Sequence, residues 1–463
     1  MTKLEQKFAP FARRMQAEGL PNITIKSFKY YYKRLLEGHT GYIPEADIFP
    51  VDTLPDMEAL PTNLITAGEQ ALKKTILLKL NGGLGTSMGL STAKSLLRVK
   101  SKYTFLDIIC HQVLQENIPL VLMNSFNTRT DSLNAIKSYP DLWHGIPLDF
   151  LQNKIPKITQ NDMTPVEWKD NPKLEWCPPG HGDIYVALVT SGMLDKIIAE
   201  GYKYVFVSNA DNLGAVIDTT ILGYFSTHDI PFLMEVADRT EADKKGGHLA
   251  KLPNGQLVLR ESAQCPSDDM NHFQNVMRHQ YFNTNNLWIN LLALKAMLET
   301  KNHILGLPMI RNSKTVDPRD ENSTTVYHLE TAMGSAIAIF NDAQAIRVPR
   351  TRFAPVKTTN DLLVMQSDIY ILNDDFHLVP NPARKLPQIV VDMDNQYYKL
   401  ISDMEKRFSH GTPSLLNCER LEIMGDVIFG KDVVLKGKVY LINESGQPVK
   451  IEDDSILHGT YRW

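Results

Sequence analysis

The sequence is poor in cysteine, in unbalanced charge and in long apolar runs. Its four cysteines lie far apart and form no Cys-x-x-Cys pair, which excludes a disulfide scaffold and a zinc site. The 49 Lys and Arg residues nearly balance the 53 Asp and Glu residues, which argues against a general nucleic-acid binder. No apolar run approaches the roughly 18 residues of a membrane span. We therefore expect a cytoplasmic globular protein with reduced thiols and with neither nucleic acid nor membrane as partner.

A helical segment opens the chain, whose 463 residues suffice for two or three domains. One face of its first helix is apolar, and Pro10 is expected to kink or delay that helix. A second helical pattern runs to Leu36 and stops at Gly38. A proline-rich stretch over 44–61 then predicts an extended connector. We assign 1–70 to this N-terminal helical segment and connector. The apolar face consists of Leu4, Phe8, Phe11 and Met15.

Alternating strands and helices begin at residue 75. Asp183 is expected to cap a helix that begins near residue 184. The alternation predicts an α/β domain over 71–385 with a mostly parallel sheet covered on both faces. In such sheets ligands bind beyond the carboxyl ends of the strands. Strands are predicted at 75–80, 119–124, 203–208 and 231–236, with helices at about 103–116, 129–138 and 218–227.

The last segment, 386–463, has a different spacing of apolar residues. A helix is predicted over about 394–408, and after Gly411 apolar residues recur every six positions. A period of six with glycines nearby is typical of a short parallel β-helix, with an antiparallel meander as the alternative. A few coils leave an open end, so this segment is the best candidate for self-association into a homo-oligomer. The two apolar rows are Leu421, Val427, Val433, Val439 and Phe429, Leu435, Leu441.

A glycine-rich stretch directly follows the first predicted strand: Leu80-Asn-Gly-Gly-Leu-Gly-Thr-Ser-Met-Gly89. Four glycines in eight positions let backbone N–H groups come close to a phosphate. The stretch lacks the lysine of a P-loop. Met88 stands where the dinucleotide fingerprint requires its last glycine, which disfavours a nicotinamide dehydrogenase. A nucleotide-phosphate cradle is therefore the favoured interpretation, and a tight turn without a ligand is the alternative.

With this stretch the sequence resembles the eukaryotic-type UTP–glucose-1-phosphate uridylyltransferase family. The resemblance continues in order along most of the chain. One departure is Thr92-Ala-Lys-Ser95, where the family usually has Gly-Pro-Lys-Ser, so the proline before Lys94 is missing. The matching stretches are Ala93–Ser95, Phe150–Gln152, Pro178–Asp183, Ser208–Leu213, Lys245–His248, Phe282–Trp288, Glu330–Gly334 and Arg352–Thr359.

The resemblance implies both a fold and a reaction. The fold is a Rossmann-like, GT-A-like nucleotidyltransferase domain with a mixed, mostly parallel sheet, followed by a left-handed parallel β-helix. The reaction is the reversible, Mg²⁺-dependent formation of UDP-glucose and pyrophosphate from UTP and α-D-glucose 1-phosphate. Alternatives are a broader UDP-sugar or UDP-N-acetylhexosamine pyrophosphorylase, and a catalytically silent nucleotide-binding subunit. The presence of Lys94, Asp211 and Lys357 argues against a silent subunit.

This reaction brings two anions together. Two unit charges about 4 Å apart repel by about 4 kcal/mol at an effective dielectric of about 20, so cations must be aimed at the phosphates. No general base is needed, because the nucleophile is already an oxyanion. The resemblance places Lys94 on the β/γ-phosphates and Lys357 between the phosphates of the two substrates. It assigns Mg²⁺ to Asp211, and one carboxylate plus phosphates is a normal Mg²⁺ arrangement.

The remaining expected substrate contacts surround the base and the sugar. The resemblance implies that Gln152 and Gly180 read the uracil edge, which requires both a donor and an acceptor. His181 is expected either to steady a phosphate or the sugar, or to be a structural hydrogen bonder. Asn209 is expected on the sugar or ribose. The further expected contacts are Leu80, Asn81, Gly82, Gly83 and Ala210 at the nucleotide, and Gly247, Asn283 and Asn285 at the glucose.

Overall fold

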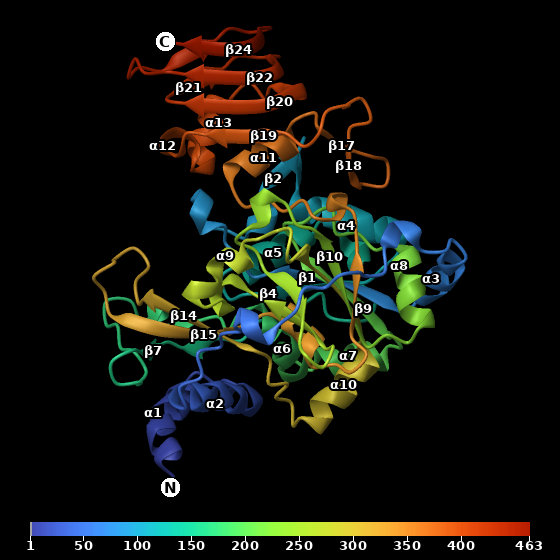
Figure 1. The fold of residues 1–463 in the computed structure, drawn as a ribbon, viewed down its shortest axis with the longest axis vertical. Coiled ribbons are helices and arrows are strands. Elements are labelled where there is room, and N and C mark those ends of the chain that lie inside the picture. The colour runs from blue at the N-terminus through green and yellow to red at the C-terminus, as the bar shows by residue number, and fades with distance from the viewer. Residues whose placement is uncertain (1) are drawn as a thin grey trace.

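The computed structural model describes residues 2–463, with the N-terminal helices at one end and stacked C-terminal strands at the other (Figure 1). α1 (Lys3–Ala17) and α2 (Asn22–Leu36) form a pair whose aromatic rings interlock, Phe11 lying 4.8 Å from Tyr32 between ring centroids. α1 begins at Lys3 and continues through Pro10 without a break, so the expected delay is wrong. The Thr2–Glu5 capping box starts the helix well before the proline.

The body is built on a mixed, mostly parallel sheet in the order β12-β11-β13-β9-β1-β4-β5, with β10 pairing with β13 and β16. β12 and β13 run against the other strands. The α/β expectation is therefore confirmed. The strands are β1 (Thr75–Asn81), β4 (Leu120–Asn124), β5 (Asp149–Leu151), β9 (Tyr204–Asn209), β10 (Phe232–Asp238), β11 (His248–Lys251), β12 (Leu257–Arg260), β13 (Tyr281–Asn290) and β16 (Gln344–Arg347).

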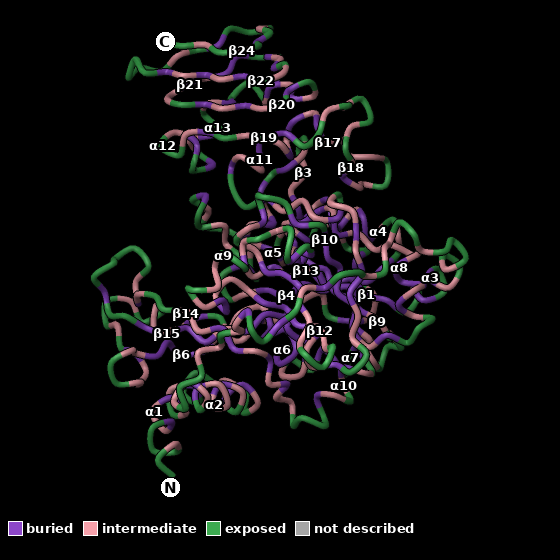
Figure 2. Tube along the Cα trace, in the orientation of Figure 1, coloured by how far each residue is buried: buried purple, intermediate pink, exposed green. Residues whose placement is uncertain are grey.

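Apolar side chains of each central strand serve two cores, one on either face of the sheet. Leu77 of β1 packs in one core with Phe206 of β9, whereas Ile76 and Leu78 pack in the other. This explains why the strand reads as a continuous apolar run. Figure 2 shows the buried trace gathered at this sheet. The body helices are α3 (Leu64–Leu72), α4 (Phe105–Glu116), α5 (Arg129–Ile136), α6 (Ile184–Thr190), α7 (Met193–Ala199), α8 (Thr219–Thr227), α9 (Met270–Phe273), α10 (Leu291–Thr300) and α11 (Thr359–Gln366).

Smaller sheets decorate the body. The hairpin of β14 (Met309–Thr315) and β15 (Thr325–Thr331) pairs with β7 (Ile158–Thr159) and projects beside the N-terminal helices (Figure 1). Asp183 makes no side-chain cap at the start of α6, so that expectation is wrong; its carboxylate is bound elsewhere, as described below. The other short strands are β2 (Arg98–Lys100), β3 (Tyr103–Thr104), β6 (Ile155–Pro156), β8 (Trp176–Cys177), β17 (Tyr370–Leu372) and β18 (Leu378–Pro380).

The C-terminal strands pair in parallel and stack one above another (Figure 1). Leu421 lies beside Val439 in the register, so three six-residue periods separate neighbours. The parallel pairing excludes the antiparallel meander. The expected helix over 394–408 is split in two. The elements are α12 (Asn395–Tyr398), α13 (Ile401–Arg407), β19 (Val390–Met393), β20 (Ser414–Met424), β21 (Val427–Phe429), β22 (Val434–Ile442), β23 (Val449–Ile451) and β24 (Ile456–Arg462).

The structure also bears on the cysteines and on the search for membrane-spanning helices. All four cysteines are buried and free. Within residues 2–463, none of the helices combines the length and the apolar character that crossing a bilayer requires.

Candidate active site

A pocket of about 520 Å³ opens beyond the carboxyl ends of β1 and β9, where a sheet of this kind binds ligands. The glycine-rich stretch forms one side, the segment around Gly180 another, and the residues after β9 the floor. Of the sequence-predicted residues, the pocket is lined by Leu80, Asn81, Gly82, Gly83, Lys94, Gln152, Gly180, His181, Asn209, Ala210 and Asp211. The structure thus brings together residues from distant parts of the chain.

The glycine-rich loop turns sharply and supports the lysine that follows it. Gly85 has φ +57, and a Cβ there would lie 2.9 Å from Leu90 and 3.4 Å from the Lys94 side chain. The backbone N–H of Lys94 donates to the Gly83 carbonyl at 3.0 Å. The loop therefore needs glycine at 85 both for its left-handed turn and for the stem of Lys94. Gly83 has open space where a Cβ would stand, as a close ligand approach requires.

Lys94 is paired with Asp211 across the pocket. Its Nζ donates to Asp211 Oδ2 at 2.6 Å, and less than a fifth of each side chain is exposed. Lys94 thus reaches Asp211, two residues after β9, despite the missing proline at position 93. No group of three or more His, Cys, Asp or Glu side chains within residues 2–463 is placed to hold a metal ion. A divalent ion here would rest on Asp211 together with ligand oxygens.

A buried lysine braces the segment that carries Asp211. Lys79 of β1 donates to Ser208 Oγ at 2.7 Å and to the Ala215 carbonyl at 3.0 Å. Burial lowers the Lys79 pKa to about 7. These two bonds tie the start and the end of the segment that carries Asn209 and Asp211. Sequence reasoning missed Lys79, although a lysine inside an apolar strand was a visible signal.

The wall opposite the lysine is formed by main-chain and amide groups. Gln152 Nε2 donates to the Gly180 carbonyl at 2.9 Å. Gly180 has φ +78, and a Cβ would lie 2.4 Å from the Thr331 carbonyl oxygen, so only glycine fits. His181 Nδ1 accepts from the backbone N–H of Met333 at 3.1 Å, and burial lowers the His181 pKa to about 4. The imidazole is therefore neutral at neutral pH, with Nε2 carrying its proton.

Asn81 and Ala210 contribute to the pocket chiefly through their backbone. The side-chain amide of Asn81 donates to Asn124 Oδ1 and to Ser132 Oγ, both at 2.7 Å. The Ala210 N–H donates to the Leu80 carbonyl at 3.1 Å, which joins the ends of β1 and β9. These contacts set the shape of the floor.

Gly247, Asn283 and Asn285 form a second cluster that does not line this pocket. The Asn283 N–H donates to the Gly247 carbonyl at 3.1 Å, and its side-chain amide donates to Asn285 Oδ1 at 3.0 Å. A Cβ on Gly247 would lie 2.5 Å from Glu261 Oε2. Burial raises the pKa of Glu261, while a hydrogen bond from Asn283 and the charge of Lys357 lower it. Sequence reasoning missed Glu261, since no spacing ties it to the asparagines.

Lys357 is exposed and lies outside the pocket lining, its Nζ 5.9 Å from the centroid of the Phe353 ring. The segment that carries it is joined to the floor, since the Val356 N–H donates to the Asp211 carbonyl at 3.4 Å. The helix that follows it is α11. The N–H groups of Lys357 and Thr358 both donate to Asp361 Oδ2 at 2.8 Å. A carboxylate of the chain itself therefore lies at the start of this helix.

The geometry can be compared with known proteins. The family model of UTP–glucose-1-phosphate uridylyltransferase matches residues 25–436. The chain belongs to this family. Its curated relatives include the UTP–glucose-1-phosphate uridylyltransferase of Solanum tuberosum, 40% identical over 417 residues that cover 89% of this chain and 84% of the relative. The enzyme of Saccharomyces cerevisiae is 41% identical over 399 residues, covering 83% and 77%.

Solved structures of the family resemble the whole chain. A mutant of UDP-glucose pyrophosphorylase from Leishmania major superposes with a TM-score of 0.93 at 43% identity, covering 100% of both chains. Another mutant of that protein, in complex with UDP-glucose, has a TM-score of 0.91 at 43% identity, covering 98% of this chain and 99% of the other. The likeness extends over the N-terminal helices and the C-terminal strands as well as the α/β body.

Proposed function

We propose that this chain transfers a uridylyl group from UTP to α-D-glucose 1-phosphate, forming UDP-glucose and pyrophosphate reversibly. The observation that carries the proposal is the Lys94–Asp211 pair facing a glycine cradle at the carboxyl ends of β1 and β9. Family membership supports the reaction and its substrates. The presence of both charged residues disfavours a silent nucleotide-binding subunit.

In this mechanism the sugar phosphate attacks the α-phosphorus in line with the departing pyrophosphate. The nucleophile is an oxyanion, so the chain supplies positive charge and orientation rather than a base. Lys94 leaves Asp211 to meet the β/γ-phosphates, and Lys357 neutralises the charge where the two phosphorylated substrates meet. Neutral His181 can donate from Nε2 to a phosphate or sugar oxygen without adding charge. We expect no covalent uridylyl-enzyme, and trapping one with labelled UTP would contradict this mechanism.

Mg²⁺ fits the residues present. Asp211 is the carboxylate at the pocket floor, and its Oδ2 is engaged by a lysine that the phosphates can attract away. Mg²⁺ is usually held by one or two carboxylates together with substrate phosphates and waters, so Asp211 would hold it. When bound, the ion neutralises charge on the triphosphate.

The two remaining groups of polar residues are assigned to recognition. Gln152 and Gly180 present an amide edge and backbone groups that suit the uracil, and Asn209 suits the ribose or sugar. Gly247, Asn283 and Asn285, with Glu261, supply donors and acceptors for glucose hydroxyls. The cluster does not line the triphosphate pocket, so the nucleotide leaves it free for the second substrate.

A pyrophosphate-release assay with UTP, Mg²⁺ and several sugar phosphates tests the proposal. We expect release with glucose 1-phosphate and far less with galactose 1-phosphate or N-acetylglucosamine 1-phosphate. Comparable rates with all three would favour the broader UDP-sugar pyrophosphorylase instead. Absence of release with every sugar phosphate would overturn the proposed function.

We further assign three units: 1–70 as the helical segment and connector, 71–385 as the catalytic domain, and 386–463 as a left-handed parallel β-helix with its preceding helices. Parallel pairing between β20, β22 and β24 and the buried six-residue rows support a β-helix. Ile456 in its last strand is exposed, which suits self-association there. Deleting 412–463 should then change the elution volume by more than the lost mass accounts for.

A further inference from the structure

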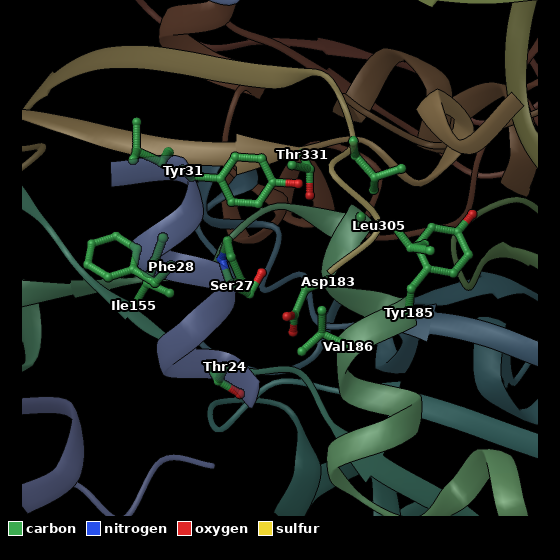
Figure 3. Close-up of a pocket in the computed structure, with 14 residues that line it drawn as sticks. Thr24, Ser27, Phe28, Tyr31, Ile155, Asp183, Tyr185, Val186, Leu305 and Thr331 are labelled. Atoms are coloured by element: carbon green, nitrogen blue, oxygen red, sulfur yellow. The ribbon is translucent and has the colours of Figure 1, made fainter. Parts of the chain in front are cut away.

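Behind the wall that carries Gln152 and Gly180 lies a small cavity of about 40 Å³. α2 forms one side of it, and the Pro179–Asp183 segment forms another. Figure 3 shows Thr24 and Ser27 of α2 facing the same space as the Asp183 carboxylate. The N-terminal helical pair therefore packs directly on the back of this wall.

The buried polar groups in this region form one connected chain. Thr24 Oγ1 donates to Asn153 Oδ1 at 2.9 Å. The Asn153 backbone N–H donates to Asp183 Oδ2 at 2.7 Å, and its side-chain amide donates to Asp183 Oδ1 at 3.0 Å. The Asp183 N–H in turn donates to the Gly180 carbonyl at 3.2 Å. That carbonyl is the one that accepts from Gln152.

The chain closes into a ring, because Asn153 directly follows Gln152. The Asp183 carboxylate thus accepts from both the backbone N–H and the side-chain amide of Asn153. The Asp183 N–H donates to the Gly180 carbonyl, which also accepts from Gln152. Thr24 and Asp183 are both buried, with 2% and 6% exposure. Burial raises the Asp183 pKa to about 6, and the hydrogen bonds from Asn153 lower it. A carboxylate buried without a cation is costly unless its hydrogen bonds are kept, which makes the ring rigid.

A second contact, between Lys154 and Glu18, also joins the N-terminal helices to this wall. Lys154, the next residue along, places its Nζ 2.5 Å from Glu18 Oε2 at the end of α1. The aromatic core of the helical pair includes Ile155 and Cys177, which flank the same wall. Both helices are therefore anchored to the short stretch that begins with Gln152.

We propose that Asn153 and Asp183 are positioning residues for the uridine base, and that Thr24 extends this function to the N-terminal helical pair. They set the distance between Gln152 and Gly180 without touching the nucleotide. The inference rests on the proposed function, since it takes this wall as the base-reading side. It predicts that changes in α2 alter nucleotide affinity and leave the phosphate chemistry alone.

Calorimetric binding of UMP, combined with steady-state kinetics, tests this inference on the full-length chain. Thr24→Val removes the hydroxyl and keeps the shape, and we expect a dissociation constant for UMP about threefold to tenfold higher, as for one lost hydrogen bond. Asp183→Asn should have a larger effect of the same kind. At saturating UTP, kcat and the KM for glucose 1-phosphate should stay within twofold of the unaltered protein.

Two controls make the test specific. Thr24→Ser retains the donor and should restore the affinity, and Ser27→Ala removes a different hydroxyl from the same cavity and should change nothing. Unchanged UMP affinity in folded Thr24→Val protein would overturn the inference, as would equal losses in kcat and in glucose 1-phosphate binding. If the unaltered protein makes UDP-glucose but the variants bind UMP normally, only this inference fails. If the unaltered protein releases no pyrophosphate with any sugar phosphate, the proposed function fails, and this inference fails with it.

Discussion

Two sides of the same pocket are built on opposite principles. The amide side (Gln152, Gly180 and His181) is closed by hydrogen bonds within the protein, and each partner is fixed before any ligand arrives. The charged side holds Lys94 and Asp211, which are paired with each other, and is extended outside the pocket lining by the exposed Lys357. The difference teaches that recognition here depends on rigidity, whereas charge neutralisation depends on groups that exchange one partner for another.

The largest expected effect comes from the exposed cation. Lys357→Ala should lower kcat by at least about 100-fold, the scale of losing one preorganised electrostatic group. Lys431→Ala, an exposed lysine of the C-terminal unit, serves as the control and should leave kcat unchanged. Steady-state pyrophosphate release measures both. A kcat within a few-fold of the unaltered protein would remove Lys357 from the charged side.

The amide side can be tested by pH. The folded-state pKa of His181, about 4, lies below its ordinary value of 6.5, so the unfolded chain binds more protons between these values. The free energy of unfolding should therefore fall as pH falls, by about 2 kcal/mol from this residue between pH 7.5 and 5.0. Urea unfolding at both pH values should show this drop reduced in His181→Gln. An identical drop in the two proteins would mean that the imidazole is not held neutral.

A substitution at Asp211 tests whether this carboxylate binds Mg²⁺ or only pairs with Lys94. Asp211→Asn removes the charge and should raise the Mg²⁺ concentration for half-maximal rate by about tenfold. The exposed Asp195, paired with Lys295, provides the control variant Asp195→Asn. An unchanged Mg²⁺ titration in Asp211→Asn would contradict the assignment.

The smallest expected effect concerns base choice. Gln152→Leu removes the amide edge and leaves the Gly180 carbonyl without that donor, so kcat/KM for UTP should fall about fivefold. The kcat/KM for CTP should change less, so the ratio of kcat/KM for UTP to that for CTP should fall. Gln115→Leu, at an exposed glutamine bonded to Asp374, controls for the loss of an amide. An undiminished preference in Gln152→Leu would show that another group reads the base.

The elements around the site follow from sequence patterns of short range. The apolar runs that end at Asn81 and Asn209 are β1 and β9. The glycines between β1 and Lys94 line the pocket, as expected of the cradle. The six-residue rows at Leu421 and Leu435 are buried in parallel strands. These patterns are readable because each depends on neighbours within one or two elements.

The misses share a different cause. Asp183 was expected to cap a helix, but its carboxylate binds Asn153, thirty residues away. Glu261 and Lys79 acquire their positions from partners in other strands. Such long-range contacts leave no spacing in the sequence, so only the fold reveals them.

A crystal structure with UTP and Mg²⁺ tests the contrast between the two sides most directly. The account predicts that the triphosphate lies in the glycine cradle, that Lys94 Nζ moves from Asp211 to a phosphate oxygen, and that the Gln152–Gly180 bond stays near its present 2.9 Å. A triphosphate outside the cradle, or Lys94 still bound to Asp211 with nucleotide present, would contradict it.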